Sequence, residues 1–317
     1  MKNFLKCPYT NEELEISESF LISKSGNKYK IEDGIYRFLN SEKIDNQTKG
    51  VREFYIDDPF PNYNDYDSLD HFVEISSKNI LTETILKLAN PGNSILEFGC
   101  GTGQLSNIIA ATGHSRIFGA DLTIRSLELA NKFKKDNKLT GINFFETDIF
   151  NNCFKENSFD IIISNGVLHH TKDPYKAFEE LCKLLKPGGF IIIGLYNKIS
   201  RLRNSFIKYL SKIFGKKIIS YFDPIYAQKN ESSKKSWYKD QYKHVLEERH
   251  TFSEVHKWFK KNNINFINSI PSYDPNVPTT HKVVKGDLID QFNVQFKDLF
   301  TNVEGGLFVF IGKKFKK

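Results

Sequence analysis

The chain lacks the cysteine patterns of disulfide-rich proteins. Its four cysteines, Cys7, Cys100, Cys153 and Cys182, lie far apart in 317 residues, and no two of them form a C-x-x-C pair. Sparse thiols of this kind are typical of proteins that fold in a reducing compartment. The sequence therefore predicts a cytoplasmic location.

Long apolar runs are also missing. The first ten residues contain no apolar core of the kind that a signal peptide needs, and the longer runs, such as 190–196, stay well below the roughly 18 residues of a membrane span. We therefore expect no transmembrane segment. The charge imbalance is small, because 45 basic residues face 38 acidic ones and leave a net charge of +7. This excess leaves nucleic acid or an anionic surface open as a partner and requires neither.

The chain is rich in apolar and aromatic residues. Hydrophobic residues make up 39% of it and aromatic residues 14%, which is too apolar for a disordered protein. Its length suffices for a sizeable core and suggests two domains, or one large domain with additions.

From residue 94 onwards, strand-like apolar runs alternate with helical periodicity. The expected strands are 95–98, 117–120, 142–145, 159–164, 190–195, 265–270 and 307–312. The expected helices start at 104 and cover about 69–88, 124–135, 174–185 and 252–262. This alternation predicts an α/β fold with a doubly wound, mostly parallel sheet. Residues 198–250 interrupt the alternation and are interpreted as an insertion.

The strongest local signal is a strand that runs into three alternating glycines and then a helix. Residues 95–103 read Ile-Leu-Glu-Phe-Gly-Cys-Gly-Thr-Gly. Glycine has no Cβ, so the backbone can approach a ligand closely, and the helix N-terminus behind the turn favours an anionic group. A dinucleotide fold would place another glycine at Gln104 or Ser106, which disfavours a nicotinamide dehydrogenase. A tight turn without a ligand remains an alternative.

The Glu-x-Gly-x-Gly-x-Gly pattern resembles motif I of the class I S-adenosylmethionine (SAM) methyltransferases. Asp121 follows the next strand, about 20 residues further on, where a carboxylate can accept hydrogen bonds from both ribose hydroxyls. Residues 146–149 (Glu-Thr-Asp-Ile), 159–165 (Phe-Asp-Ile-Ile-Ile-Ser-Asn) and 186–189 (Lys-Pro-Gly-Gly) resemble further motifs in the family's order. The resemblance, to a type 11-like methyltransferase domain, covers about 93–200.

The resemblance implies a Rossmann-like sheet of seven strands and SAM as the cofactor. It assigns Glu97, Gly99, Gly101 and Gly103 to the methionine part of SAM, Asp121 to the ribose, Leu122 to the adenine face, Asp148 and Ile149 to the adenine edge, and Asn165 to the floor near the methionine. On this basis we divide the chain into a small β module at 1–45, cap helices and an aromatic loop at 46–92, a SAM-binding core at 93–197, a basic helical insertion at 198–250 and the completion of the sheet at 251–317.

Two histidines after the fourth strand are candidates for a catalytic base. An ordinary histidine pKa near 6.5 suits proton transfer, and His170 is favoured over His169. Alternatively, both line the pocket passively, because the similar double histidine of quinone-biosynthesis C-methyltransferases need not be a base. No Asn/Asp-Pro-Pro-Tyr/Phe motif follows this strand, which argues against amino methylation of adenine or glutamine.

Residues 1–45 resemble a zinc-ribbon-like module that also occurs as a small activator of tRNA, rRNA and protein methyltransferases. The likeness rests on Cys7-Pro8 and on the pattern Gly-x-x-Tyr-x-Ile-x-Asp-Gly at 26–34. The metal-binding version needs two C-x-x-C pairs, and here Thr10, Ile22 and Ser25 stand in the other three places. We therefore predict a degenerate module without a metal.

The insertion begins with a basic segment. Residues 198–217 carry seven basic side chains and no acidic one, and apolar residues recur among them at helical spacing. This pattern predicts a basic amphipathic helix. Four interpretations of this helix are open. The most favoured is a cap with a solvated face, followed by a site for an anionic substrate, a membrane contact and, least favoured, an RNA contact.

Two further segments are expected near the site. Polar and aromatic residues that we interpret as a substrate-side wall are Asp240, Gln241, Tyr242, His244, Glu247, Arg249, His250, Trp258 and Phe259. The aromatic loop at 54–63 would close over SAM or simply pack. Thr251 and Glu254 have the spacing of a capping box at a helix start.

Together these features predict a SAM-dependent methyltransferase that acts on an anionic or amphipathic small molecule. A non-catalytic SAM-binding or partner-activating protein is an alternative, as is a methyltransferase acting on tRNA or protein. Whether oxygen, nitrogen, carbon or sulfur is methylated stays open.

Overall fold

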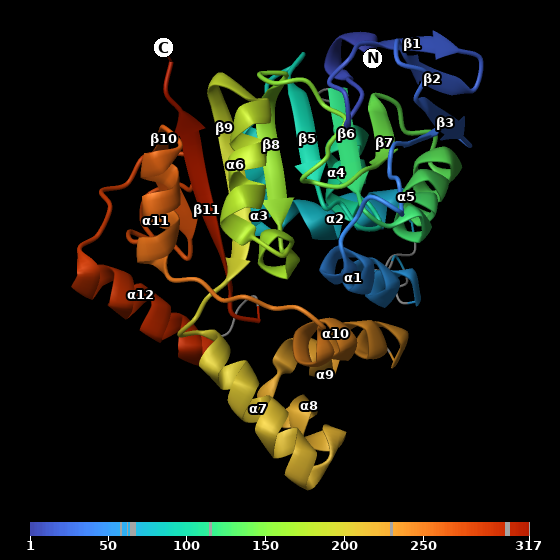
Figure 1. Cartoon of the computed structure of the whole chain (residues 1–317). Coiled ribbons are helices and arrows are strands. Elements are labelled where there is room, and N and C mark those ends of the chain that lie inside the picture. The colour runs from blue at the N-terminus through green and yellow to red at the C-terminus, as the bar shows by residue number, and fades with distance from the viewer. Residues whose placement is uncertain are drawn as a thin grey trace.

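The computed structural model describes residues 1–57, 59–61, 63, 68–113, 116–228, 231–301 and 305–316. These residues form one mixed sheet with helices on both faces (Figure 1). Across the sheet, its eleven strands have the order β1-β2-β3-β4-β7-β6-β5-β8-β9-β11-β10.

Seven of the strands lie close to their predicted positions, and helices separate all of them except β7 and β8. The parallel strands are β5 (Ser94–Phe98), β6 (Arg116–Asp121), β7 (Ile142–Glu146), β8 (Phe159–Asn165) and β9 (Leu185–Tyr196). β11 (Leu307–Lys314) runs antiparallel to both β9 and β10 (Ile264–Ile270). The isoleucine runs of β8 and β9 are buried because helices cover both faces of the sheet.

The chain reverses its direction of travel across the sheet at β5. From β5 it proceeds to β6 and β7 on one side, then returns to β8 and β9 on the other. In open α/β sheets such a switch point leaves a crevice at the carboxyl ends of the strands, which is where ligands bind.

The prediction of a seven-stranded sheet was wrong in extent, because residues 1–45 add four strands. They are β1 (Leu14–Ser17), β2 (Phe20–Ser23), β3 (Lys28–Glu32) and β4 (Ile35–Arg37). β4 pairs in parallel with β7 and so covers the edge of the seven-stranded part. The short helix η1 (Lys2–Phe4) adds an aromatic contact, with the rings of Phe4 and Phe118 4.7 Å apart.

The helices of the core lie close to their predicted positions. They are α4 (Gln104–Ala111), α5 (Ile124–Asp136), α6 (Pro174–Leu184) and α11 (Phe252–Lys261). The single helix expected at 69–88 is two, α2 (Leu69–Ser77) and α3 (Ile80–Leu88), because Asn79 caps α3 by accepting from the backbone N–H groups of Leu81 and Thr82. α1 (Asn46–Asp57) precedes them.

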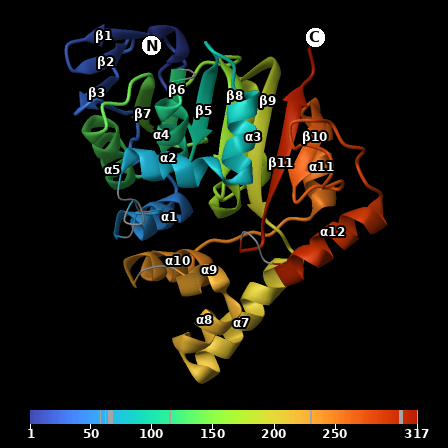
Figure 2. The same ribbon diagram turned by 180° about the vertical axis from the view of Figure 1, so that it is seen from behind.

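The insertion is helical and lies beyond the carboxyl ends of the parallel strands (Figures 1 and 2). It contains α7 (Arg201–Phe214), η3 (Lys216–Ile218), α8 (Ile219–Phe222), α9 (Pro224–Gln228) and α10 (Glu231–Lys243). α12 (Leu288–Thr301), which was not predicted, contacts α7 and α11. In the described part of the chain, no helix is long and apolar enough to cross a membrane.

Candidate active site

A cavity of about 570 Å³ opens at the carboxyl ends of the strands. Eight of the nine residues predicted to bind SAM line it: Glu97, Gly99, Gly101, Asp121, Leu122, Asp148, Ile149 and Asn165. Gly103 is not among the lining residues. It packs beneath the turn, where an added Cβ would lie 2.7 Å from the Cβ of Ala130.

The glycine turn is held by a carboxylate from the neighbouring strand. The backbone N–H of Gly101 donates to Oδ2 of Asp121 over 2.8 Å, and the N–H of Thr123 donates to Oδ1 over 2.8 Å. Each carboxylate oxygen keeps a further lone pair for a ligand hydroxyl. Burial raises the pKa of Asp121, although the backbone hydrogen bonds oppose this rise.

Part of the predicted aromatic loop passes directly over this turn. Gly101 has a φ of +53°, and an added Cβ would lie 2.3 Å from the carbonyl oxygen of Phe60, so only glycine allows this approach. Phe60 and Pro61 both line the cavity. Residues 58 and 62 of the loop lie outside the described residues.

Glu97 is a buried acid at the inner end of the cavity. Its Oε2 accepts a hydrogen bond from the Ser106 hydroxyl. Burial, with a further contribution from the charge of Asp121, raises the pKa of Glu97 to about 8. Glu97 is therefore mostly protonated at neutral pH, and a cation bound nearby would favour its ionised form.

Asp148 and Asn165, both predicted to bind SAM, also line the cavity. Asp148 is fixed by the side-chain amide of Asn151 at 3.0 Å and the backbone N–H of Phe150 at 3.3 Å. Oδ1 of Asn165 is buried and has no hydrogen-bond partner among the residues that the structure describes. A buried acceptor in a cavity wall is satisfied when a ligand donates to it.

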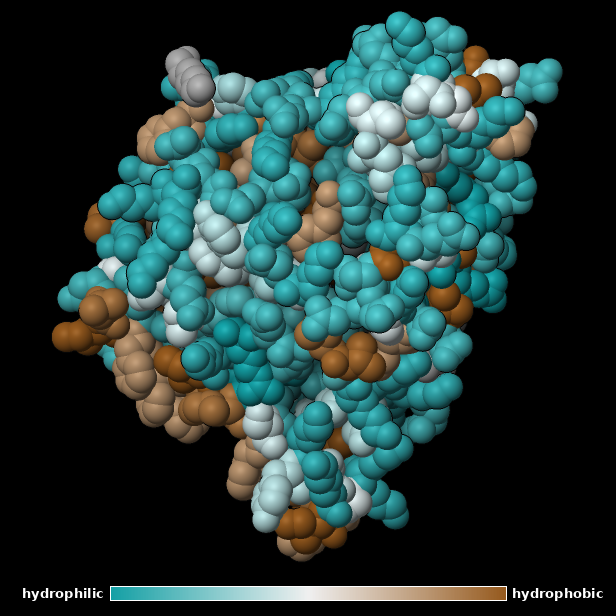
Figure 3. All heavy atoms as spheres, in the orientation of Figure 1, coloured by the Kyte–Doolittle hydropathy of each residue, from teal (hydrophilic) through white to brown (hydrophobic). Residues whose placement is uncertain are grey.

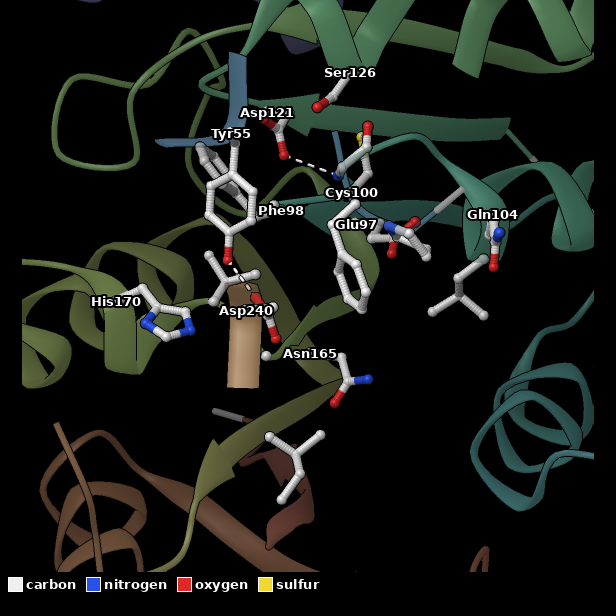
Figure 4. Close-up of a pocket in the computed structure, with 18 of the residues that line it drawn as sticks. Tyr55, Glu97, Phe98, Cys100, Gln104, Asp121, Ser126, Asn165, His170 and Asp240 are labelled. Atoms are coloured by element: carbon white, nitrogen blue, oxygen red, sulfur yellow. Dashed lines mark hydrogen bonds between the residues drawn. The ribbon is translucent and has the colours of Figure 1, made fainter. Parts of the chain in front are cut away.

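The opposite wall brings together residues far apart in the sequence (Figure 4). The Tyr55 hydroxyl donates to Oδ1 of Asp240 over 2.8 Å. Oδ2 of Asp240 accepts from the Gln241 side-chain amide at 2.9 Å and from the Tyr196 hydroxyl at 3.3 Å. Burial raises the pKa of Asp240, while the hydrogen bonds from Tyr55 and Gln241 lower it.

The sequence only partly identified this wall. It placed Asp240 and Gln241 in a substrate-side wall without roles, and Tyr55 in an aromatic loop. Tyr196 was missed, although its place at the carboxyl end of β9 was a usable signal. Of the residues in the predicted wall, only Asp240 and Gln241 line the cavity.

The two histidines have different surroundings. His170 lines the cavity, and its Nδ1 lies 2.6 Å from the carbonyl oxygen of Leu246. Burial lowers the pKa of His170 to about 4, so the ring is neutral, Nδ1–H donates and Nε2 is left as an acceptor. His169 is buried against the Tyr196 ring, 4.0 Å between centroids, and is not among the residues lining the cavity.

One member of the basic stretch is structural. Arg201 is buried at the start of α7, where its guanidinium is 2.6 Å from both Glu247 Oε2 and Gln241 Oε1. It also lies 3.9 Å above the Tyr196 ring. Arg201 therefore ties the insertion to the cavity wall instead of contributing to a solvated basic face.

Comparison with known families shows to which protein family the chain belongs. Residues 89–263, more than half of the chain, match the family described as "Methyltransferase domain". The chain belongs to this methyltransferase family. The match confirms the methyltransferase resemblance and the Rossmann-like fold that it implied, and the matched segment contains every residue predicted to bind SAM.

The curated relatives of this methyltransferase domain are distant. The mitochondrial ubiquinone biosynthesis O-methyltransferase of Dictyostelium discoideum is 28% identical over 143 residues, which cover 42% of this chain and 43% of that one. The 2-phytyl-1,4-naphtoquinone methyltransferase of Nostoc punctiforme is 29% identical over 176 residues, which cover 50% of this chain and 76% of that one. The chain thus spans less than half of the Dictyostelium relative.

Among solved structures, PKMT2 from Rickettsia typhi is similar in fold. Its TM-score is 0.51 at 20% identity, and the similarity covers 74% of this chain and 52% of PKMT2. At this identity the likeness concerns the fold of the methyltransferase domain alone.

Proposed function

We propose that this methyltransferase domain binds SAM in the cavity and methylates a small molecule held against Asp240. SAM supplies a methyl group already activated on a sulfonium. The observation that carries the proposal is that one cavity joins the glycine turn, Asp121 and Asp148 on one wall to Tyr55 and Asp240 on the other. Holding two reactants in one orientation supplies roughly 7–11 kcal/mol of such a reaction's barrier.

The residues of the SAM wall suit the chemistry of this cofactor. The lone pairs of Asp121 accept from ribose hydroxyls, and Leu122 and Ile149 offer apolar surface for the adenine. Glu97 compensates the positive charge of the methionine part when it ionises. The unsatisfied Oδ1 of Asn165 accepts a hydrogen bond from a donor of the same part.

We assign the movement of the acceptor's proton to Asp240. A carboxylate with a raised pKa is a better proton acceptor than an exposed one, and Tyr55 and Gln241 fix its orientation. His170 has a pKa near 4, which makes it a weak base at neutral pH. We therefore propose that Nε2 of His170 positions the acceptor.

The lining of the cavity favours an amphipathic acceptor over an anionic one. Aromatic and aliphatic side chains from Phe60, Tyr196, Trp237, Leu307 and Val309 line the same cavity as Asp240. No lysine or arginine is found among the described residues that line the cavity. An apolar or aromatic molecule with an ionisable hydroxyl fits these walls, in keeping with two relatives named for quinones.

Methylation of hydroxyaromatic compounds with methyl-labelled SAM tests the proposal. The wild type transfers label to at least one compound of a panel, and Asp240→Asn lowers kcat by about 10²–10⁴ with an unchanged SAM affinity. His170→Ala, which removes the proposed positioning group, should raise the KM for the acceptor without adding a new pH dependence of kcat between about pH 6 and pH 9. SAM binding without turnover of any compound would instead favour the non-catalytic alternative.

We also propose that residues 1–45 are a degenerate zinc-ribbon-like module without a metal. Among the residues the structure describes, no group of three or more His, Cys, Asp or Glu is placed to bind an ion. Cys7 is buried, and its Sγ lies 2.9 Å from the Tyr29 hydroxyl, within hydrogen-bond distance. Stoichiometric zinc in the purified protein would contradict this. The cytoplasmic location stays a prediction.

A further inference from the structure

α12 is amphipathic in the reverse sense of an ordinary surface helix. Its polar side chains Gln291, Gln295 and Asp298 are buried. Its apolar side chains face outward: Leu288, Ile289, Phe292, Phe296 and Phe300 are all exposed, with Leu288 74% and Phe300 67% accessible. A helix on the surface of a globular protein normally turns its apolar stripe toward the core.

Hydrogen bonds fix this orientation. Oε1 of Gln295 accepts from the Asn197 side-chain amide at 2.9 Å and from the backbone N–H of Phe252 at 3.3 Å. Oε1 of Gln291 accepts from the Ser253 hydroxyl at 2.7 Å. Rotating the helix to bury its phenylalanines would leave these groups unsatisfied, so the apolar face is held outward.

α7 extends this surface. Leu202, Phe206, Tyr209 and Ile213 recur every three or four residues and are all more than half exposed. The guanidinium of Arg203 in α7 donates to the backbone carbonyl of Phe300 in α12 at 2.9 Å, which joins the two helices. We call these four residues and the five apolar residues of α12 the apolar ridge.

The ridge is visible on the surface of the molecule. Figure 3 shows apolar side chains gathered over α12 along the lower left edge and again at the far end of α7. In Figure 1 the two helices follow one another along the side of the molecule that lies away from the N-terminal strands. Exposed apolar side chains gathered in this way mark a site of interaction.

The charges beside the ridge select the partner. Lys208, Lys212, Lys216 and Lys217 are exposed on or just after α7, and residues 197–222 carry no acidic side chain. The acidic residues Asp287 and Asp290 lie at the N-terminal end of α12, away from these lysines in the sequence. Apolar side chains flanked by lysines are the pattern of helices that lie in the interface of an anionic membrane.

We propose that the apolar ridge docks onto the surface of an anionic lipid bilayer, with α7 and α12 lying in the interface. A second copy of this chain fits less well, because a two-fold contact through the ridge would bring the lysines of both copies together. Docking needs neither SAM nor acceptor. A failure of this proposal therefore leaves the proposed function intact, and the reverse also holds.

Co-sedimentation of the full chain with lipid vesicles tests the proposal. We expect binding to phosphatidylcholine vesicles that contain phosphatidylglycerol, little binding to phosphatidylcholine alone, and weaker binding as salt rises. Replacing Phe292, Phe296 and Phe300 with serine should weaken the partition coefficient roughly a hundredfold or more. Lys208→Ala with Lys212→Ala should weaken it roughly tenfold or more.

A matched control uses exposed apolar residues elsewhere. Ile16→Ser with Phe20→Ser changes the β1–β2 hairpin, far from the ridge, and should leave vesicle binding unchanged. If the triple serine variant does not fold, Phe296→Trp replaces it, and its fluorescence should shift to the blue on anionic vesicles. Absence of vesicle binding would overturn the proposal, as would full binding by a folded triple variant or a solution dimer that this variant dissociates.

Discussion

At the scale of single residues, Asp121 both holds the glycine turn and offers the proposed ribose site. Its oxygens accept from the backbone N–H groups of Gly101 and Thr123. Asp121→Ala removes the ribose acceptors and loosens the turn. Loss of hydrogen bonds to a charged group should weaken SAM binding about 10–100-fold in titration calorimetry.

Asp160 provides the matched control for this variant. Its carboxylate also accepts a backbone N–H, that of Ser94 at 2.8 Å, together with Lys186 at 2.9 Å. Asp160 lies near the amino-terminal end of β8, at the end of the strands opposite to the cavity. Asp160→Ala should therefore keep its SAM affinity, and an Asp121→Ala variant that binds like the wild type would refute the ribose assignment.

Glu97 couples SAM binding to a proton. Its pKa of about 8 in the free protein means that it is mostly protonated at neutral pH. A bound cation lowers this pKa, so binding near pH 7 releases up to one proton, and affinity rises as the pH approaches 8. The apparent binding enthalpy near pH 7 should therefore depend on the ionisation enthalpy of the buffer.

The Glu97→Gln variant isolates this effect. It cannot ionise, so its binding enthalpy should be the same in every buffer once other groups are accounted for. If the wild type also gives one enthalpy in all buffers, Glu97 does not ionise on binding.

Residue patterns predicted the SAM wall better than the acceptor wall. Glu97 lies near the end of β5, Asp121 ends β6 and Asp148 follows β7, so their positions at the carboxyl ends of the strands can be read from the local sequence. Tyr55 and Asp240 are 185 residues apart, and only the docking of the insertion brings them together. No local spacing encodes such a contact.

At the scale of elements, α11 begins with the capping box that the sequence predicted. The backbone N–H of Glu254 donates to Oγ1 of Thr251, and the N–H of Thr251 donates to Oε2 of Glu254. Thr251→Ala should lower the free energy of unfolding by about 1 kcal/mol, because it leaves a helix N–H unsatisfied.

Chemical denaturation measures this change. Thr251→Ser keeps the hydroxyl and should retain most of the stability, which separates the cap from the packing of the threonine methyl group. A Thr251→Ala variant as stable as the wild type would show that the cap contributes nothing measurable.

Helices with a conventional pattern were predictable, and α12 was not. α6 and α11 bury apolar side chains at helical spacing, so periodicity locates them. α12 buries glutamines and exposes phenylalanines. The buried Gln291 and Gln295 find their hydrogen-bond partners in α11 and in the segment after β9, which no local pattern reveals. The break between α2 and α3 was missed because the apolar pattern continues across the Asn79 cap.

At the scale of the whole molecule, residues 1–45 continue the sheet of the methyltransferase domain. β4 pairs with β7, and Tyr36 stacks on Phe145 with centroids 4.9 Å apart. The sequence indicated hairpins here but not their pairing with an edge strand almost 110 residues further on, for which no local signal exists.

Removal of residues 1–45 should therefore destabilise the remainder. It exposes the edge of β7 and apolar side chains such as Phe118, so we expect aggregation or a lower thermal midpoint. Ile16→Ser, which alters an exposed side chain of the outer hairpin, should behave like the wild type. A soluble 46–317 fragment with an unchanged midpoint would show that the module is dispensable for the fold.

The central claim is that the cavity at the carboxyl ends of β5 to β8 is a SAM site. Titration calorimetry of the full chain with SAM, and in parallel with NAD, tests it most directly. The account predicts saturable binding of one SAM per chain and no binding of NAD. Absence of SAM binding, or saturable binding of NAD instead, would contradict it.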